Sequence, residues 1–254
     1  MADEQTVASR RIADDFAAQI DEGTLKPGTK LPSERTLVRT YGVARNTVQA
    51  AMRLLAEAGM VVAHHGKGVY VREPEPLIRL GSDRYSPKYR ESGLSPFLIE
   101  CERAGKRGRF EVLSIDRAQP PHDVAERLHV DERTPSVLRR ENVFWADDDP
   151  VYRVTTYVPW TIAEGTGLLE PEIPHPYGIH GVLEAQGYPM ARLHDSAVAR
   201  MPTLAEREAL KLAAGVPVLD LLHVSVRADG TPYEATRFVM RGDMSSLVYD
   251  VPIE

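Results

Sequence analysis

Residues 1–72 of this chain alternate short amphipathic segments with turn signals, and this pattern leaves few folds open. Apolar residues recur at every fourth position from Ile12 to Ile20, which predicts a helix over residues 7–22 with one apolar stripe. A Pro-Gly turn follows, and Ser33 then offers an N-cap for a second helix. That helix is short, because a Tyr-Gly pair closes it at Gly42.

The next segment predicts a third helix and a hairpin. Residues 45–58 carry their apolar side chains on one face, and Gly59 ends the helix. Two β-prone runs, 61–63 and 69–71, then flank a basic, glycine-rich tip. Three helices with a tight turn between the second and third, followed by a basic hairpin, predict a winged helix-turn-helix over residues 1–72.

Charge is divided unevenly along the chain. The whole sequence carries −6, but residues 25–72 hold eight basic and two acidic side chains, so this segment carries +6 and the rest −12. Blocks of opposite charge predict a module that faces phosphates, joined to one that does not. The lone Cys101 can form no internal disulfide, and no apolar run approaches the ~20 residues of a membrane span. We therefore expect a cytoplasmic protein with no membrane partner.

The start of the third helix carries the residues best suited to read bases. Arg45, Asn46, Thr47 and Gln49 lie in its first turns, and Arg45 and Gln49, four residues apart, point to the same side. Arginine can bind guanine through two hydrogen bonds, and glutamine or asparagine can bind adenine in the same way. Double-stranded DNA is the predicted partner.

Two further groups suit the rest of a DNA surface. Ser33 and Arg35, at the start of the second helix, are placed for a backbone phosphate. The wing tip of His65, Gly66 and Lys67 can lie against the minor groove, where glycine permits close approach. The alternative is that all these polar residues are only the solvated side of small amphipathic helices.

Motifs of fixed spacing run through the same region. They are L-x-P-G-x-x-L-P-S-E-R-x-L from Leu25, Y-G-V-x-R-x-T-V from Tyr41, E-x-G from Glu57 and G-x-G from Gly66. Across residues 7–72 they resemble the DNA-binding domain of the GntR family of bacterial transcription regulators.

This resemblance implies which residues meet DNA and how the protein assembles. The family's DNA contacts would fall on Arg35, Arg45, Thr47 and Gly66, in a homodimer on a palindromic operator. The sequence departs from the family at Ala44, where serine is common, and at Gln49, where arginine often reads bases. The departures leave the operator sequence open.

A polar linker separates this region from the rest of the chain. The run Glu-Pro-Glu-Pro from Glu73 predicts a stiff connector. A second basic stretch, residues 84–90, is expected to be extended. The predicted division is a linker over residues 73–93 and a second domain over residues 94–254.

The second domain contains an internal repeat with a constant offset. Each copy predicts a helix end, a strand, an Ala-Asp turn and a second strand, with hairpins at 137–145/151–158 and 218–226/233–240. We therefore expect an α+β protein whose second domain is a mostly antiparallel sheet with pseudo-twofold symmetry and helices on one face. The alternative is that Ala-Asp-x-x-Pro is simply a favourable turn. The residues that recur are Leu128, Pro135, Ala146, Asp147 and Pro150, which match Leu210, Pro217, Ala228, Asp229 and Pro232 in the second copy.

Turn motifs in this domain carry a second resemblance. They are A-D-x-x-P from Ala146, Y-x-P from Tyr157, G-x-P-x-E from Gly230 and R-G-D from Arg241. Over residues 94–250 they resemble the effector-binding (UTRA) domain of HutC-type GntR members, which implies a chorismate-lyase-like fold that binds a small molecule.

The resemblance also bears on the class of effector. In sugar-phosphate-sensing members two arginines hold the phosphate, and their positions here are Asn142 and Phe144. A glutamate and a tyrosine of those members become Val154 and Met240, and only Glu234 is retained. A phosphosugar is therefore disfavoured.

We expect a pocket, if one is present, to combine cationic, polar and apolar side chains. For each candidate the alternative is a surface or sheet-edge position. The candidates are Arg139, Arg140, Tyr157, Arg192, His194 and Glu234, with Phe144 and Met240 as apolar walls.

Two other functions stay open for the second domain: dimerisation without a ligand, and a lyase-like enzyme. The histidines show no metal-ligand spacing, no phosphate-binding glycine loop occurs outside the wing, and Cys101 has no recognisable base partner. We therefore expect no metal, cofactor or catalytic residue. The sequence favours a repressor that a small molecule of unknown identity releases from DNA.

Overall fold

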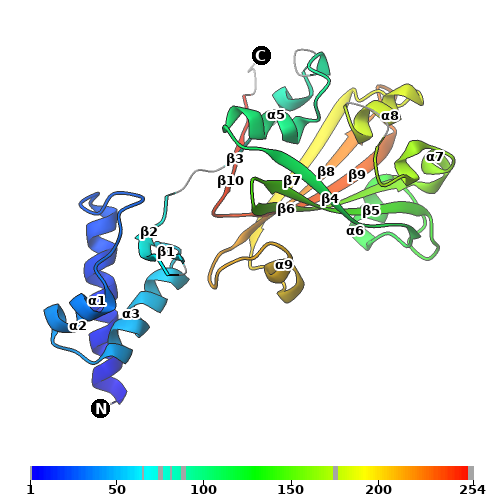
Figure 1. The fold of residues 1–254 in the computed structure, drawn as a ribbon. Coiled ribbons are helices and arrows are strands. Elements are labelled where there is room, and N and C mark those ends of the chain that lie inside the picture. Colours follow the sequence, from blue (N-terminus) through cyan, green and yellow to red (C-terminus); the bar gives the residue numbers. More distant parts are fainter. Residues whose placement is uncertain are drawn as a thin grey trace. The chain divides into compact units, whose positions relative to one another are not determined.

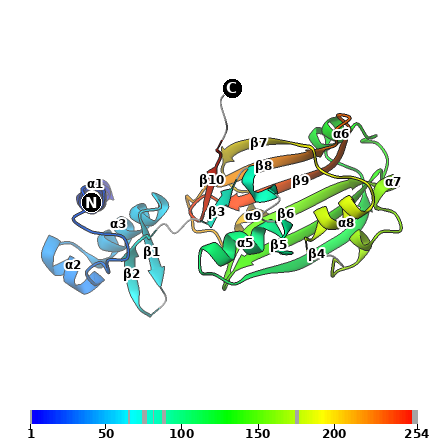
Figure 2. The ribbon, with the colours of Figure 1, turned by 90° about the horizontal axis from the view of Figure 1, so that it is seen from above.

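The computed structural model describes residues 2–64, 66–73, 77–80, 82–86, 90–173 and 177–250. The chain folds as two compact units, one holding residues 1–75 with 212–216 and the other holding residues 76–211 and 217–254. Figures 1 and 2 show a small helical unit and a larger unit built on a sheet.

The first unit contains the three predicted helices and the hairpin. Ser33 caps α2 by accepting a hydrogen bond from the N–H of Thr36 at 3.2 Å, and Gly42 ends that helix in the left-handed conformation at φ 64°. Phe16 and Leu55 are among the buried residues of its core. The prediction of a winged helix-turn-helix is confirmed, with the first helix beginning five residues earlier than expected. The elements are α1 (Ala2–Asp21), α2 (Glu34–Tyr41), α3 (Arg45–Glu57), β1 (Val61–His64) and β2 (Gly68–Val71).

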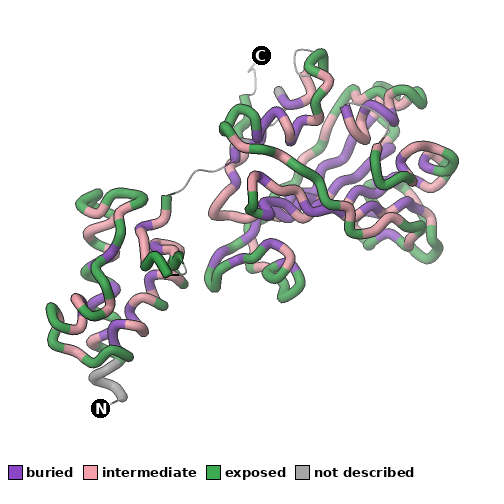
Figure 3. Tube along the Cα trace, in the orientation of Figure 1, coloured by how far each residue is buried: buried purple, intermediate pink, exposed green. Residues whose placement is uncertain are grey.

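The second unit is organised around a six-stranded antiparallel sheet. Its strand order is β4-β5-β6-β9-β8-β7, so the two predicted hairpins, β5–β6 and β8–β9, meet at the centre. Buried residues concentrate in these central strands (Figure 3). The strands are β4 (Gly108–Ala118), β5 (Val137–Ala146), β6 (Asp149–Pro159), β7 (Arg192–Arg200), β8 (Val218–Val226) and β9 (Pro232–Arg241).

The strand register confirms the predicted pseudo-twofold symmetry. Thr155 of β6 pairs with Arg237 of β9, its own equivalent in the second copy of the repeat, so a local twofold axis passes between the two strands. Each hairpin also has a β-bulge, at Phe144/Trp145 in the first and at Ser225/Val226 in the second. Along the sequence, the two bulges are one position closer together than equivalent residues of the two central strands are.

Helices cover both faces of this sheet, whereas the sequence predicted helices on one face. The repeated helices α6 (His122–Leu128) and α9 (Leu204–Ala209) contact the central strands β9 and β6. The opposite face packs against α5 (Pro96–Arg103), α7 (Trp160–Ala163) and α8 (Ile179–Ala185), with η2 (Gly167–Leu169) beside them. The second layer comes from segments that lie outside the repeat, so the repeat could not predict it.

The segment that enters the second unit is more ordered than the sequence predicted. Strand β3 (Leu77–Leu80) pairs in parallel with β10 (Ser245–Val248), and the 3-10 helix η1 (Ser82–Tyr85) follows it. Arg84 is buried beside Glu100, with 3.3 Å between Nη1 and Oε1. The prediction of an extended basic connector is therefore wrong at Arg84 and Tyr85, because a buried partner holds the arginine. Residues 74–76 and 87–89 of the expected linker lie outside the described residues.

Candidate nucleic-acid interface and ligand cavity

One acidic residue positions the two side chains expected to read bases. Glu34, the first residue of α2, accepts a hydrogen bond from Nε of Arg45 at 2.8 Å and from Nε2 of Gln49 at 3.2 Å. The side chain of Arg45 is nonetheless 73% exposed. Two helices therefore hold the donors of Arg45 and Gln49 side by side on an accessible face.

Most of the other predicted DNA contacts are also accessible. Gly66 adopts φ 72°, a left-handed conformation that suits glycine at a tight wing turn. Thr47 differs, because it is only 4% exposed. It shares the core-facing side of α3 with Ala51, one helical turn later, and not the side of Arg45. His65 lies outside the described residues. The exposed candidates are Ser33, Arg35, Asn46, Gly66 and Lys67.

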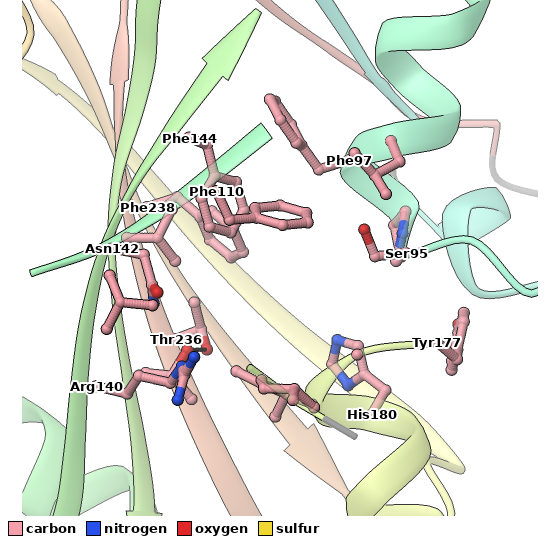
Figure 4. A pocket seen from close by; sticks show the side chains of 18 of the residues that line it. Ser95, Phe97, Phe110, Arg140, Asn142, Phe144, Tyr177, His180, Thr236 and Phe238 are labelled. Atoms are coloured by element: carbon pink, nitrogen blue, oxygen red, sulfur yellow. Dashed lines mark hydrogen bonds between the residues drawn. The ribbon is translucent and has the colours of Figure 1, made fainter. Parts of the chain in front are cut away.

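The second unit contains a cavity of about 470 Å³ between the sheet and helices α5 and α8 (Figure 4). Arg84 of η1 and Ser95, which precedes α5, also contribute to its wall. Its volume falls within the range of roughly 300–1,000 Å³ typical of small-molecule sites. The cavity is therefore large enough for a metabolite.

Strand alternation decides which side chains form the sheet side of the cavity. Even-numbered residues of β5 point into it, so Arg140, Asn142 and Phe144 share one face while Arg139 points to the other. The register aligns these residues with polar and apolar partners on the neighbouring strands. One row consists of Val112, Asn142, Val154 and Phe238, and the next of Arg140, Thr156, Thr236 and His223.

Arg140 is a buried cation held by backbone oxygens. It is 3% exposed and donates to the carbonyls of Leu168, Glu170 and Pro171 at 3.3, 2.6 and 2.5 Å. No carboxylate of the described residues forms an ion pair with it, and burial lowers the pKa of its guanidinium. Its positive charge is therefore solvated by dipoles and not neutralised by a protein anion.

Glu234 contributes a buried carboxyl group to the same cavity. It is 1% exposed and accepts hydrogen bonds from the hydroxyl groups of Ser225, at 2.5 Å, and Thr236. The hydroxyl of Ser225 is also 3.3 Å from Nε2 of His223. A hydrogen-bonded chain therefore leads from the cavity wall into the next strand.

His223 extends this chain to the margins of the sheet. Its Nδ1 is 2.6 Å from Oδ1 of Asp195, and Oδ2 of Asp195 accepts from the hydroxyl of Tyr249 at 2.7 Å. Burial raises the pKa of Asp195, but hydrogen bonds from His223 and Tyr249 outweigh it and hold that pKa below its usual value. Nε2 of His223 lies 3.4 Å from the hydroxyl of Tyr85 in η1. The chain therefore joins the cavity to the segment entering this unit.

Two polar atoms on the helical side of the cavity have no hydrogen-bond partner among the described residues. Ser95 precedes the first turn of α5, yet its buried hydroxyl does not cap that helix. Nδ1 of His180 is buried and equally unpaired. Burial, with the positive fields of His223, Arg84 and Arg90, lowers the pKa of His180 to about 3, so its ring is neutral at pH 7. Figure 4 shows both side chains facing the sheet.

Two family models match this chain. The model of bacterial regulatory proteins of the gntR family matches residues 8–71, and the UTRA domain model matches residues 103–246, more than half of the chain. The chain belongs to the GntR family, in the HutC-type branch that carries a UTRA domain. Its first unit is a DNA-binding domain, and its second is of the type that binds small-molecule effectors.

Relatives that match over nearly their whole length support the same conclusion. An HTH-type transcriptional regulator of Streptomyces coelicolor is 31% identical over 96% of this chain and 92% of its own. The transcriptional repressor NagR of Bacillus subtilis is 24% identical over 94% and 92%. The crystal structure of a GntR-family regulator has 26% identity and a TM-score of 0.65 over 97% of this chain and 98% of that one. The chain is thus a transcription regulator and not an enzyme.

The structure of this GntR/UTRA regulator brings three of the eight predicted effector residues together. Arg140, Phe144 and Glu234 line the cavity. The other five lie elsewhere in the unit. Arg139 pairs with Asp116 at 2.7 Å on the opposite face of the sheet.

The remaining four predicted effector residues lie outside the cavity wall for different reasons. Tyr157 packs in the core beside α6, and Met240 is buried in the cluster beneath α5. Arg192 and His194 are exposed on the edge strand β7. The sequence resemblance could not fix which face of a strand each residue occupies.

The sequence reasoning missed most of the aromatic and helical side of the cavity. Phe238 was recoverable, because the repeat places β6 beside β9 and the register aligns Phe238 with Asn142. Phe110 was not, because its strand β4 lies outside the predicted hairpins. Ser95 and His180 were not, since nothing local indicates that α5 and α8 cover this face.

Neither a metal cluster nor a membrane span was found in the part of the chain that the structure describes. No group of three or more His, Cys, Asp or Glu residues there could hold a metal ion. None of the described helices is long and apolar enough to cross a bilayer.

Proposed function

We propose that this regulator is a homodimeric repressor that a small molecule releases from a palindromic operator. The observation that carries the proposal is the cavity in the UTRA domain, because Arg84 and Ser95, from the segment that leads into this domain, form part of its wall. An occupied cavity can thus favour a different conformation of that segment. Release then requires that the ligand bind the two conformations with different affinity.

Within this proposal the chain divides into three functional parts. Residues 1–72 bind DNA, residues 73–93 connect, and residues 94–254 bind the effector and dimerise, all in the cytoplasm. The repressor named among the relatives supports the direction of control, since the match to NagR covers 94% of this chain.

The DNA contacts of the proposal divide into base-reading and phosphate-binding groups. Arg45, Asn46 and Gln49 read bases. The exposure of Arg45 and Asn46 and the half-buried position of Gln49 beside Arg45 on α3 support this. The proposed phosphate and minor-groove contacts are Ser33, Arg35, His65, Gly66 and Lys67. Thr47 is a buried residue of α3 whose side chain faces the core, so it contacts DNA at most through its backbone.

Selection of operator sites tests the DNA half of the proposal. The full-length protein, incubated with a randomised duplex library, is expected to enrich inverted repeats whose half-sites lie on one face of the duplex. Such sites follow from a symmetric dimer of small reading domains. Enrichment of single half-sites or direct repeats would contradict the palindrome.

A two-step ligand screen tests the effector half. Metabolites that raise the melting temperature of the full-length protein are added to its complex with the selected operator, and fluorescence anisotropy of labelled DNA is recorded. A compound that binds should weaken operator binding. If every compound that stabilises the protein leaves operator affinity unchanged, the UTRA domain does not act as proposed.

A further inference from the structure

One end of the cavity is lined by a cluster of phenylalanine rings. The ring of Phe97 from α5 lies 4.9 Å from that of Phe144 and 5.6 Å from that of Phe110, between centroids. Phe110 and Phe144 are 4.6 Å apart, and Phe238 adjoins them on β9 (Figure 4). Such rings favour a flat apolar group, which can stack on their faces or meet their edges.

The charges around the cavity favour a negative ligand. Arg140 has no carboxylate partner among the described residues, and the buried guanidinium of Arg79, 4.1 Å from the ring centroid of Phe238, has no hydrogen-bond partner there either. Two acidic residues also line the cavity. Glu172 is exposed to solvent, and both carboxyl oxygens of Glu234 already accept hydrogen bonds from the hydroxyl groups of Ser225 and Thr236. A ligand cation would be repelled by the arginines, whereas an anion would be attracted.

Hydrogen-bond donors line both the sheet wall and the helical wall of the cavity (Figure 4). Arg140 has Nε–H and one Nη2 hydrogen to spare after its bonds to backbone carbonyls. The amide of Asn142 lies on the sheet wall, and the buried Ser95 hydroxyl has no hydrogen-bond partner in the described part of the chain. The N–H of Phe97, second residue of α5, has no partner within its helix, and the helix dipole adds positive potential there.

We propose that the cavity binds a monocarboxylic acid whose apolar body is about the size of one or two fused rings. The carboxylate would lie between Arg140 and the first turn of α5, and the body among the phenylalanines. This inference rests on the proposed function, that the cavity holds the effector. A dianionic phosphate is disfavoured, because Asn142 and Phe144, next to Arg140 on the same face of β5, carry no charge.

The test compares ligands that share a body and differ in head group. The probes are phenylacetate, phenylacetamide and phenethylamine, and indole-3-acetate, indole-3-acetamide and tryptamine. Calorimetric melting of the full-length protein at millimolar ligand should show a larger rise with the acid than with the amide or amine of the same body. Equal rises within both series, larger rises with the amines, or no rise with either acid would overturn the proposal.

A substitution that changes the charge of the cavity wall but not its shape tests ligand recognition without disturbing the fold. Asn142→Asp places a carboxylate beside Arg140 and should weaken binding of the better acid about tenfold or more, while its amide loses little. Arg139→Met, one position from Arg140 on the opposite face, is the matched control and should leave both affinities unchanged. Equal loss of acid and amide in Asn142→Asp would contradict the assigned carboxylate position.

A second pair of variants tests Arg140 itself. Arg140→Met should lose the preference for acid over amide, and Arg140→Lys, which keeps a cation but not the guanidinium fork, should retain part of it. Circular dichroism checks folding, since Arg140 also holds residues 168–171. If Arg140→Met binds the acid as well as the parent does, or if Arg140→Lys loses the preference as fully as Arg140→Met, the proposal fails.

The outcomes distinguish this inference from the proposed function. A neutral or cationic compound that fills the cavity and releases the operator would leave the proposed function standing and refute the ligand class. An acid that binds as expected without changing operator affinity would support the ligand class and refute the proposed function.

Discussion

At the scale of single residues, Glu34 determines how the two proposed base-reading side chains of α3 are arranged. Its carboxylate engages Arg45 and Gln49, which are one helical turn apart, before any DNA is present. Preordering the two side chains reduces the rotamer entropy lost on binding. We therefore expect the departure from the family at Gln49 to change which bases are read without disturbing the geometry of the face.

Two substitutions should separate base reading from phosphate attraction. Arg45→Ala is expected to relax base preference at one position of each half-site, by about 1–3 kcal/mol, because a bidentate base contact is lost. Lys67→Ala should weaken all sequences alike and reduce the salt dependence by about one counterion per protomer. Competition shift assays at several salt concentrations measure both. If Arg45→Ala keeps its base preference, then α3 does not read bases through Arg45.

Removal of the carboxylate should affect specificity more than stability. Glu34→Gln keeps the shape of the side chain but loses an ion pair whose arginine is 73% exposed, and such pairs contribute only about 0–1 kcal/mol. We therefore expect a nearly unchanged melting temperature and a smaller ratio of operator to random-sequence affinity. Glu57→Gln, at the other end of α3, is the control. A large loss of stability with unchanged specificity would argue against the positioning role.

At the scale of elements, the sheet-facing helices are fixed by ion pairs as well as by apolar contacts. Arg200 at the end of β7 donates to both carboxylate oxygens of Glu206 in α9, at 2.8 and 2.7 Å, and to Asp220 of β8 at 2.9 Å. Glu206 also accepts from the N–H of Thr203 in a capping box. One carboxylate therefore both caps the helix and attaches it to the sheet.

Loss of this carboxylate should make the UTRA domain less stable in a pH-dependent way. Hydrogen bonds from Arg200 lower the pKa of Glu206 to about 2, below its ordinary 4.5. Its contribution is therefore complete above pH 4.5 and is lost as the pH falls toward 2. Glu206→Gln should lower the free energy of unfolding by about 2 kcal/mol at pH 7, and the difference from the parent should narrow below pH 4.5.

The measurement can be confined to the UTRA domain. Both tryptophans, Trp145 and Trp160, lie in the second unit, so tryptophan fluorescence during urea unfolding reports on that unit alone. Glu208→Gln, an exposed acid of the same helix, should leave the transition in place. A Glu206→Gln difference that stays constant down to pH 2 would contradict the assigned pKa.

The hydrogen-bonded chain through Ser225 should couple the cavity to the segment that enters the domain. Ser225→Ala removes the hydroxyl that bridges Glu234 and His223. We expect the ligand to bind within a few-fold of its parent affinity while its effect on operator affinity declines. Ser196→Ala, an exposed hydroxyl on β7, is the control. If Ser225→Ala responds to ligand as the parent does, coupling runs through other contacts.

Secondary structure was the part of the account most accessible from sequence. Ser33, Gly42 and the apolar stripes fixed α2 and α3 to within a residue, because caps and periodicity act locally. The internal repeat located both hairpins, and with them the centre of the sheet. These features need no knowledge of distant contacts.

The cavity was harder to predict from the sequence, and two of its arginines show why. Arg139 and Arg140 are chemically alike, and only the pairing register decides that Arg140 points inward. Arg84 looked like part of a solvated basic connector, but Glu100 of α5, distant in sequence, draws it into the interior. Helix-on-sheet packing between segments outside the repeat formed the other wall, and local patterns do not encode it.

At the scale of the whole molecule, release from the operator depends on a coupling free energy between two sites on different units. The proposed DNA contacts lie within or close to the basic segment of residues 25–72, and the cavity lies in the acidic remainder of the chain. A ligand can change operator affinity only by the ratio of its affinities for the free and operator-bound forms. A tenfold release therefore requires about 1.4 kcal/mol of differential binding.

Coupling between the cavity and the operator is measured by the affinity of the stabilising acid for the free protein and for the operator-bound protein. Isothermal titration calorimetry with full-length protein, alone and saturated with the selected palindrome, gives the two dissociation constants under one buffer. We expect weaker binding to the operator complex, by the same factor by which the acid weakens operator binding. Equal dissociation constants in the two titrations would contradict it.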